Sequence, residues 1–433
     1  MSGLARMLLQ KNEKVSGSDI SDSYVTQYLI TAGAEVFLGH NKEHIPSEST
    51  VVYSTDIAPD NPELIEARMR GGPVWHRSDL LAALMKPYEA LLVAGTHGKT
   101  TTTALLSHVF RSAGKDPSFA VGGMLHGLQC SSNCGSGSYF IAEADESDGT
   151  FLKYDYKAAI VTNIDTDHLA YFGNWNALVE AFTSFMAKAP DPDLLFYCVD
   201  DPTLAEINCA GVPYGFSERA LFRAINFRQN GFTITYDVVY REKIFRDVHV
   251  SLTGLHNARN SLAVFALCTT LGLDEVEIRT GLSTFSGVKR RLEKKGECCG
   301  VEVYDDYAHH PTEIQATLHA LRLAVGKRRI IAVFQPHRYS RMRFLLKNFA
   351  DTFNDADIIL ITDLYTAKEA AVHGVNSEVI FQEIKRFYPA NTYFIPRDLL
   401  VEGIQEMFKT GDVLITMGAG DITKVGSELC SPG

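Results

Sequence analysis

The sequence predicts an α/β protein built from three domains. Its 433 residues, at roughly 150 residues per domain, are enough for two or three domains with a core in each. The chain is 45% hydrophobic and 21% charged, as ordinary globular proteins are. Short apolar runs alternate with helical segments along it, which is typical of parallel sheets with helical crossovers. We expect the domains at residues 1–86, 87–286 and 287–433.

The first two stretches each begin with strands that alternate with helical pieces. Strand candidates in the first stretch lie at 14–16, 35–38 and 50–54, which predicts half of a Rossmann-like domain. The second stretch opens with the apolar run 90–94, a glycine-containing turn and a helix over 100–113. Further elements are expected there as strands at 139–142 and 158–163, helices at 176–188 and 258–271, and a β-rich segment at 225–252.

The third stretch follows a basic run at 289–295. Its strand candidates alternate with helical segments and predict a second Rossmann-like domain with a parallel sheet, with strands at 301–304, 329–334, 358–362 and 413–417.

Composition limits the partners of the chain. With 41 basic and 52 acidic residues the net charge is −11, so no general attraction to nucleic acid is expected. The chain lacks an apolar run of the ~20 residues that span a bilayer and a signal-peptide pattern, so we expect no membrane insertion and a cytoplasmic location. The eight cysteines have no metal-ligand spacing and are interpreted as free thiols.

The segment LLVAGTHGKTTTT has the pattern of a phosphate-binding loop between a buried strand and a helix. Its glycines allow backbone N–H groups to approach phosphate, the lysine offsets negative charge, and the first threonine hydroxyl suits Mg²⁺. A chance GKT in a surface turn is the alternative. The loop departs from the common spacing, because Val93 stands where a glycine is usual. The candidate nucleotide-binding residues are Gly95, Thr96, His97, Gly98, Lys99, Thr100 and Thr101.

Two acidic runs follow apolar strand candidates of the same stretch. EADESD offers Glu143, Asp145, Glu146 and Asp148, and NIDTDH offers Asp165, Asp167 and His168. Phosphoryl transfer needs cations near the γ-phosphate, so metal ligands are expected at such strand ends. Either run alone could be an ordinary polar loop.

With these motifs in order, the chain resembles the Mur ligase superfamily. The resemblance rests on GTHGKTTT, EADESD, TNIDTDH, GLHNARN, GVKRRLE, DDYAHHPTE, FQPHRYSR and GAGDI, and covers nearly the whole chain. It is greatest to the branch that joins L-alanine to UDP-N-acetylmuramate in peptidoglycan synthesis, with ATP and Mg²⁺ or Mn²⁺ as cofactors. It implies a UDP-binding domain, a central P-loop ATPase-type domain and a C-terminal amino-acid domain.

The resemblance also implies roles for individual residues of the central region. Thr100, Glu143 and His168 would hold metal, with Glu143 preferred to Glu146 on alignment only. Asn257 and Asn260 would contact adenine, whereas helix capping by asparagine is the other interpretation.

Further implied residues lie in the third stretch. Arg291 would reach the γ-phosphate and Asp306 the ribose, although a basic run is otherwise most often a solvated face. His309, with His310 beside it, and His337, Arg338 and Arg341 would collect the amino-acid carboxylate and transition-state charge. Guanidinium groups suit that task because they bind carboxylates with two parallel hydrogen bonds. Catalysis would thus rest on Lys99, Arg291, His309, Arg338 and Arg341.

The chain departs from the family pattern at two places. It begins at MSGLA, where the family's glycine-rich loop and first strand would come just before, so we expect a trimmed UDP-binding domain or a start further upstream. Asp19, Ser54 and His76 are the remaining UDP-site candidates. Thr183 and Ser184 stand where several sister ligases carry a carbamylated lysine, which agrees with the alanine-adding branch.

Two competing functions stay open at this point. The first is a murein tripeptide recycling ligase, which FQPHRYSR disfavours because that branch resembles FEPRSN here. The second is an inactive nucleotide-binding protein on the same fold, which the joint presence of Lys99, Glu143, His168 and Arg291 disfavours. Fusion to, or association with, a neighbouring peptidoglycan enzyme is also considered, and the choice among alanine, serine and glycine stays open.

Overall fold

The chain folds into two compact units, which are described separately. The structure, a computed structural model, describes residues 1–430. Unit 1 contains Met1–Ile164, Asn176–Pro213 and Ala266–Gly281, and unit 2 contains Asp165–Trp175, Tyr214–Phe265 and the described chain from Leu282 onward. No helix among residues 1–430 has both the length and the apolar character needed to cross a membrane.

A mostly parallel sheet forms the centre of unit 1. Its strands lie in the order β10-β9-β5-β8-β6-β7, and only β7 runs antiparallel to its neighbour. The central strand β5 is buried from Ala90 to Ala94, because parallel strands covered on both faces read as continuous apolar runs. The strands are β5 (Glu89–Ala94), β6 (Ser118–Leu125), β7 (Cys130–Asn133), β8 (Tyr139–Glu143), β9 (Ala158–Val161) and β10 (Leu195–Cys198).

The two predicted helices of this region agree with the observed ones to within one residue at each end. The helix expected at 100–113 is α5 (Lys99–Ser112), and that expected at 176–188 is α7 (Trp175–Ala187). The strand expected at 158–163 ends early, at Val161, because the next two residues turn toward the loop after β5. Short α8 (Pro202–Glu206) follows β10, and α10 (Glu275–Thr284) begins in unit 1.

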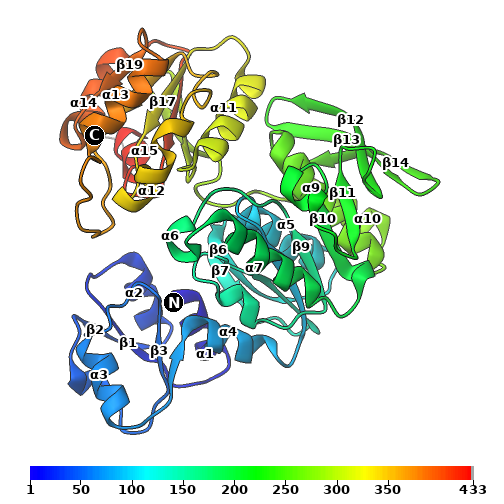
Figure 1. Ribbon diagram of the computed structural model, residues 1–433, viewed down its shortest axis with the longest axis vertical. Helices are drawn as coiled ribbons and strands as arrows, with labels where there is room; N and C mark the ends of the chain where they lie inside the picture. The colour runs from blue at the N-terminus through cyan, green and yellow to red at the C-terminus, as the bar shows by residue number, and fades with distance from the viewer. Residues whose placement is uncertain (431–433) are drawn as a thin grey trace. The chain divides into compact units, whose positions relative to one another are not determined.

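Residues 1–86 form a second part of unit 1, drawn in blue in Figure 1. Two small parallel sheets, β1-β2 and β3-β4, alternate with helices. The first strand begins at Ser16, two residues after the expected start, and the three-residue β4 was not predicted. The elements are α1 (Ser2–Gln10), β1 (Ser16–Asp19), α2 (Tyr24–Thr31), β2 (Glu35–Leu38), β3 (Val51–Tyr53), α3 (Pro62–Met69), β4 (Val74–His76) and α4 (Arg77–Met85).

Unit 2 contains an antiparallel ribbon, a short helical turn and the first part of a longer helix. The β-rich segment expected at 225–252 is the ribbon β12 (Phe222–Asn230), β13 (Thr233–Tyr240) and β14 (Lys243–Val250). The start of β12 pairs with the end of β11 (Val212–Gly215). Helix α9 (Leu255–Thr270) begins directly after Gly254, three residues before the expected start, and α6 (Leu169–Phe172) is a single turn after His168.

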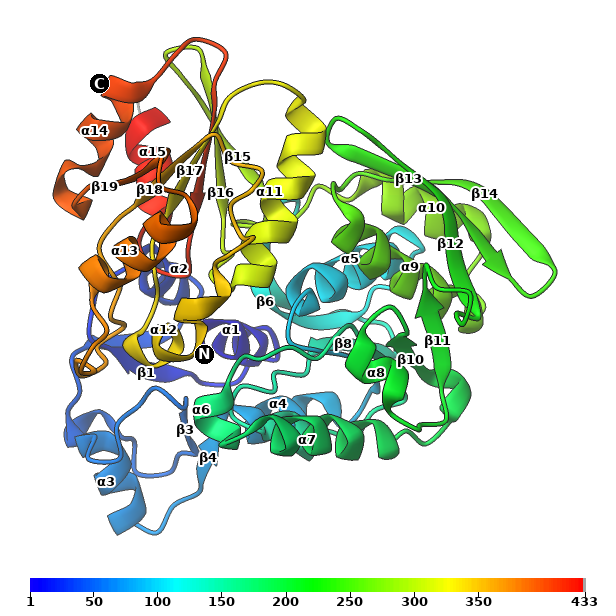
Figure 2. The same cartoon turned by 45° about the horizontal axis from the view of Figure 1, so that its top comes forward.

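The rest of unit 2 is a six-stranded sheet with helices on both faces. The strand order is β15-β16-β20-β17-β18-β19, and all pairs are parallel except β15 with β16. Figure 2 shows the helices around this sheet. The four predicted strands correspond to β16 (Val301–Asp306), β17 (Ile330–Phe334), β18 (Ile358–Ile361) and β20 (Val413–Met417), and the edge strands β15 (Glu293–Cys298) and β19 (Thr392–Phe394) were not predicted.

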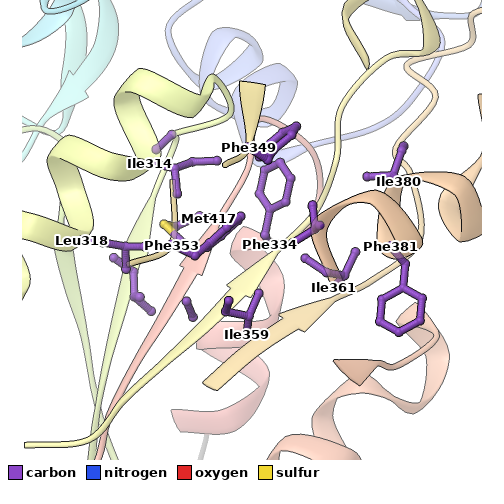
Figure 3. Packing of buried hydrophobic residues seen from close by; sticks show 14 of the residues in the cluster. Ile314, Leu318, Phe334, Phe349, Phe353, Ile359, Ile361, Ile380, Phe381 and Met417 are labelled. Atoms are coloured by element: carbon purple, nitrogen blue, oxygen red, sulfur yellow. The ribbon is translucent and has the colours of Figure 1, made fainter. Parts of the chain in front are cut away.

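Two apolar clusters cover the two faces of this sheet. One cluster packs alternate strand residues against α11 (Pro311–Val325), α12 (Tyr339–Leu345) and α13 (Ser377–Phe387). Figure 3 shows its centre, where Phe334, Phe349 and Phe353 lie beside Ile314 and Met417. The other cluster packs the opposite strand residues against α14 (Leu400–Met407) and α15 (Thr423–Cys430). Burial on both faces fixes the register, and because β16 to β20 run parallel, their carboxyl ends lie on the same side of the sheet.

Candidate active site

The loop after β5 has the backbone of a phosphate cradle. This phosphate loop (residues 95–101) leaves the sheet at Gly95 and enters α5 at Gly98, both with positive φ, of 127° and 85°. A Cβ on Gly95 would lie 2.1 Å from Thr162 Oγ1, so only glycine fits there. The N-terminus of a helix offers unpaired N–H groups and a positive dipole, which favour an anion.

The TNID run braces the phosphate loop from the neighbouring strand. Asn163 Oδ1 accepts from the His97 N–H at 2.9 Å, and Asn163 Nδ2 donates to the His97 carbonyl at 2.9 Å. Thr162 Oγ1 donates to the same carbonyl at 2.6 Å, and the Thr96 N–H donates to the Asn163 carbonyl. Four hydrogen bonds therefore fix the loop before any ligand binds, which lowers the entropy cost of binding.

Lys99 lies folded over the phosphate loop. Its Nζ donates to the carbonyls of Gly95 at 2.6 Å and Thr96 at 3.1 Å, and it lies 2.7 Å from Glu146 Oε2. Burial opposes the charged form, but Glu146 and Asp145 raise the pKa of Lys99 above its ordinary value. Burial raises the pKa of Glu146 to about 7, whereas the ammonium favours the carboxylate. Because Lys99 stays protonated near pH 7, we interpret the two as an ion pair.

Thr100 and Glu143 form the candidate metal site of unit 1. The Thr100 hydroxyl donates to Glu143 Oε1 at 2.7 Å, and the Gly122 N–H donates to Oε2. Burial raises the pKa of Glu143, with Thr100 and Lys99 opposing. A hydroxyl and a carboxylate oxygen beside a phosphate cradle match the hard oxygen ligands that Mg²⁺ prefers, so these residues fit the metal. This geometry favours Glu143 over Glu146, which instead pairs with Lys99.

The rest of the acidic run turns toward residues 55–77. Arg77 Nη2 lies 3.0 Å from Asp145 Oδ2 and 3.3 Å from Asp148 Oδ2. Thr55 Oγ1 donates to Asp148 Oδ2 at 2.6 Å and lies 3.0 Å from His76 Nε2. We name residues 143–148 the acidic loop, because their four carboxylates contact both the phosphate loop and this earlier part of unit 1.

Two of the three candidate UDP-site residues lie together. Ser54 follows β3, and His76 ends the paired strand β4, where Tyr53 and His76 are in register. Asp19 ends β1 in the other small sheet and accepts from the Ser21 N–H at 3.1 Å. The structure therefore groups Ser54 with His76 and leaves Asp19 in a separate sheet.

In unit 2 the candidate adenine pair lies on the first turns of α9. Asn257 Nδ2 donates to the Thr253 carbonyl at 2.8 Å, and Asn260 Nδ2 donates to Asn257 Oδ1 at 3.1 Å. Asn257 is thus inside the helix and fastens its start by donating to a carbonyl, rather than by accepting from a backbone N–H as a capping residue does. The two amides bond to each other, so their orientations are coupled.

Arg291 and Asp306 lie close together at the start of the C-terminal sheet. Asp306 accepts from the Leu292 and Ala308 N–H groups, both at 2.7 Å. Burial raises the pKa of Asp306 to about 6, and the charge of Arg291 opposes that rise. The Arg291 guanidinium lies 5.4 Å from the centre of the Tyr307 ring. Asp306 is therefore held rigidly by the backbone, with its oxygens beside an arginine.

The arginine–histidine cluster (His309, His337, Arg341 and Asp167) lies at the carboxyl ends of β16 and β17. Arg341 donates through Nε and Nη2 to both carboxylate oxygens of Asp167, at 3.4 and 3.3 Å, and through Nη1 to His337 Nδ1 at 2.9 Å. His337 Nδ1 must accept, so its proton is on Nε2. His309 Nδ1 lies 2.9 Å from the Tyr307 carbonyl and must donate, which leaves a lone pair on Nε2.

Burial and Arg341 keep both histidines of this cluster neutral. They lower the pKa of His309 to about 4 and that of His337 to about 3. Burial opposes ionisation of Asp167, but Arg341 holds the pKa of this carboxyl well below its ordinary value. The cluster thus combines one fixed cation and anion with two neutral imidazoles.

Three further predicted residues of unit 2 lie near this cluster. Arg338 precedes α12 with a positive φ of 65° and its Nε lies 4.0 Å from Glu369. His310 caps α11, accepting from the Thr312 N–H at 3.3 Å. His168 also has a positive φ, of 58°, and its Nε2 lies 3.6 Å from Asp167.

Sequence reasoning missed several residues that hold the site. Arg77 and Gly122 carried no motif of their own, although Arg77 directly follows the candidate His76. A Cβ on Gly122 would lie 2.3 Å from Glu143 Oε2, a constraint that only the folded backbone reveals. Asp167 was noted as an acid of the NIDTDH run, but its pairing with Arg341 joins segments 174 residues apart.

Comparison with known proteins adds an independent line of evidence. Three family profiles match consecutive stretches of the chain: "Mur ligase family, catalytic domain" at residues 1–89, "Mur ligase middle domain" at 93–268 and "Mur ligase, glutamate ligase domain" at 290–420. A UDP-N-acetylmuramate–L-alanine ligase of Protochlamydia amoebophila (strain UWE25) is 44% identical over 432 residues, which is 100% of this chain and 95% of the relative. Its counterpart in Geobacter sp. (strain M21) is 39% identical over 434 residues, 99% of this chain and 94% of the relative.

Other relatives extend the comparison to a fusion protein and to solved structures. The chain is 40% identical over 430 residues to the bifunctional enzyme MurC/Ddl of Chlamydia caviae, covering 99% of this chain and 53% of that protein. The crystal structure of the UDP-N-acetylmuramate–alanine ligase of Thermotoga maritima has a TM-score of 0.85 at 27% identity, covering 99% of this chain and 95% of that chain. A murein peptide ligase of Psychrobacter arcticus has a TM-score of 0.72 at 24% identity, with the same coverage, which shows the shared fold.

Proposed function

The chain belongs to the Mur ligase family, and from that premise we propose that it is an ATP-dependent ligase joining L-alanine to UDP-N-acetylmuramate. The main support for the proposal is the 44% identity, over the whole chain, to a relative that is named a UDP-N-acetylmuramate–L-alanine ligase. The braced phosphate loop with Lys99, Thr100 and Glu143 supplies the chemistry that such a ligase needs.

We propose that the fold comprises three domains. The division of the chain into two compact units does not define the boundaries between them. Residues 1–86 would hold the UDP moiety, 87–286 the ATP, and 287–433 the amino acid. Three consecutive family profiles over nearly the same stretches support this division. A fusion relative also exists, which supports association with a second peptidoglycan enzyme as a property of some members of the family.

The reaction needs two steps because a carboxylate is a poor acyl donor. The muramate carboxylate attacks the γ-phosphorus of ATP and forms an acyl phosphate, with ADP as leaving group. Lys99 would offset charge on the transferring phosphoryl group, and Arg291 would reach it from its place beside Asp306 and Tyr307. Asn257 and Asn260 would orient adenine, and Asp306 the ribose. The loop residues 95–101 would cradle the phosphates through backbone N–H groups.

Mg²⁺ would be held by Thr100 and Glu143, with His168 as a further ligand. When bound, the ion would neutralise phosphate charge and polarise the γ-phosphoryl group. The 2.7 Å contact of the Thr100 hydroxyl with Glu143 supports the first two ligands, because both oxygens already lie within the reach of one cation. Mn²⁺ shares this preference for oxygen and nitrogen ligands.

The second step needs a neutral amine held beside the acyl phosphate. Arg341 and Arg338 would bind the alanine carboxylate through their guanidinium groups. The unprotonated Nε2 of His309 would accept the proton that the ammonium group loses, and His337 would donate from Nε2. The amine then attacks the acyl carbon and phosphate leaves. Asp19, Ser54 and His76 would contact the UDP moiety.

The test is phosphate release from MgATP with UDP-N-acetylmuramate and each of L-alanine, L-serine, glycine and the muramyl tripeptide as acceptor. Release that requires both the sugar nucleotide and L-alanine is the expected result. Release that requires the tripeptide would instead identify a recycling ligase. A chain that binds ATP but releases no phosphate with any acceptor would contradict the proposed ligase and favour an inactive nucleotide-binding protein.

A further inference from the structure

The acidic loop contacts the phosphate loop at one end and residues 55–77 at the other. Glu143 accepts from Thr100, and Glu146 pairs with Lys99. Five residues after Glu143, Asp148 contacts Arg77 and Thr55. A stretch of that length spans less than about 18 Å even when fully extended, so both sets of contacts belong to one short segment.

The contacts of Asp148 form an ordered hydrogen-bond chain. The Thr55 hydroxyl has one proton, which it donates to Asp148 Oδ2 at 2.6 Å, so it accepts from His76 Nε2 at 3.0 Å. The other imidazole nitrogen, Nδ1, lies 2.8 Å from Ser78 Oγ and accepts from the Ser78 N–H at 3.3 Å. His76, a UDP-site candidate, is thereby locked in one tautomer by a residue of the acidic loop.

The surroundings of Asp148 keep its carboxyl group ionised. Its side chain is 9% exposed, and its Oδ1 accepts from the Thr150 hydroxyl at 2.5 Å and the Thr150 N–H at 3.2 Å. Burial would raise the pKa of Asp148, but the hydrogen bonds from Thr150 and Thr55 and the charge of Arg77 hold it below its ordinary value. Arg77 also bonds to Asp145, so one guanidinium joins two carboxylates of the acidic loop.

We propose that Arg77 and Asp148 are positioning residues that couple binding of the uridine sugar nucleotide near His76 to binding of ATP at the phosphate loop. The inference rests on the proposed function. Binding of the sugar nucleotide fixes His76 and Thr55. Through Asp148 and Arg77 it then fixes the acidic loop and the carboxylates that contact Thr100 and Lys99. By reciprocity, ATP strengthens sugar-nucleotide binding by the same factor.

Calorimetric titration of a non-hydrolysable ATP analogue with Mg²⁺, with and without saturating UDP-N-acetylmuramate, measures this coupling. In the wild type we expect the Kd of the analogue to fall about 5-fold or more when the sugar nucleotide is present. In Arg77→Ala and Asp148→Asn the Kd ratio falls to about 1, and Arg77→Lys, which keeps the charge, recovers part of it. Asp148→Asn preserves shape and keeps the test valid if Arg77→Ala does not fold.

The matched control is Lys157→Ala. Lys157 makes an ion pair with Glu89 at 2.7 Å in the same unit, away from the acidic loop. The control should retain the wild-type Kd ratio, and its unfolding midpoint calibrates what the loss of an ion pair does to stability. An unchanged ratio in folded Arg77→Ala and Asp148→Asn, or no coupling in the wild type, overturns the inference and leaves the ligase assignment intact. A wild type that binds the ATP analogue but not UDP-N-acetylmuramate contradicts the proposed function itself.

Discussion

The phosphate loop of unit 1 and the arginine–histidine cluster of unit 2 both follow parallel strands, but they control protonation differently. Burial favours neutral forms in both places. Beside the phosphate loop, Lys99 opposes this by favouring the carboxylate of Glu146. In the cluster, Arg341 adds to it by disfavouring protonation of His309 and His337. One site therefore holds paired charges, and the other holds neutral imidazoles.

The largest expected effect comes from removing the cation of the charged site. Lys99→Met removes the cation beside the phosphate loop, and kcat should fall about 1000-fold, equivalent to about 4 kcal/mol of transition-state stabilisation. Phosphate release at saturating substrates measures the loss. Lys115→Met, an exposed lysine just after α5, is the control and should keep full activity. A Lys99→Met enzyme within tenfold of the wild type would remove Lys99 from the proposed mechanism.

The next effect concerns the backbone under the charged site. Gly95→Ala places a Cβ 2.1 Å from Thr162 Oγ1 at a φ of 127°, so the free energy of unfolding should fall by about 3 kcal/mol. Gly114→Ala is the control, because its φ of 67° is strained but no atom lies within 4 Å of its Cβ. Denaturant unfolding of both variants measures the difference. Equal losses would mean that Thr162 moves aside and that the close approach is not required.

A third prediction concerns how the unfolding free energy depends on pH because the histidines of the cluster are neutral. The pKa of His309 is about 4 in the fold and 6.5 in an unfolded chain, so between these values only the unfolded chain binds the proton. Stability from this group is complete above pH 6.5 and is lost as pH falls toward 4. Between pH 7.5 and pH 5, His309 should lower the unfolding free energy of the unit by about 2 kcal/mol, in addition to the contribution of His337.

Two variants isolate the contribution of His309 to that pH dependence. His309→Asn should reduce the fall in unfolding free energy across the window by about 2 kcal/mol, and the part that His337 causes should remain. His319→Asn, which replaces an exposed histidine on α11, the helix that follows His309, should leave the fall unchanged. A wild-type slope in His309→Asn would show that His309 is protonated in the fold near pH 5.

The smallest expected effect tests the geometry of the fixed cation. Arg341→Lys keeps the charge but cannot bond to Asp167 through two nitrogens and to His337 through a third. The KM for L-alanine should rise about tenfold, equivalent to about 1.4 kcal/mol, while the KM for UDP-N-acetylmuramate stays constant. Arg343→Lys, an exposed neighbour on α12, is the control. Equal rises in both KM values would assign Arg341 to the fold as a whole rather than to the amino-acid site.

The sequence predicted the fold class and most long elements, because buried parallel strands such as β5 and β20 read as continuous apolar runs. It missed β6, an eight-residue strand that contains two consecutive glycines, and the shorter strands β4, β7, β10, β11, β15 and β19, whose pairing depends on distant residues. The family and its fold were confirmed by the comparisons with known proteins. The domain boundaries and the residue roles stay predictions.

The site residues show where local pattern stops being informative. Lys99 and Thr100 could be identified because a phosphate loop is a continuous motif, and Glu143 needed the fold to separate it from Glu146. Arg77, whose partners lie about 70 residues away in the chain, could not be found, because an ion pair between distant segments leaves no periodic signal in either. Ion pairs between distant segments are therefore the part of the site that only the folded structure reveals.

The antiparallel edge strand β15 has a consequence for how the protein behaves in concentrated solution. Its sequence, EKKGEC, places four charges along one edge of the C-terminal sheet, and Lys294 pairs with Glu302 across to β16. An open edge of a parallel sheet is a template for pairing with another chain, whereas a short charged strand repels an approaching copy. Replacing its charges with apolar residues would create a surface prone to aggregation, so β15 protects the colloidal stability of the protein.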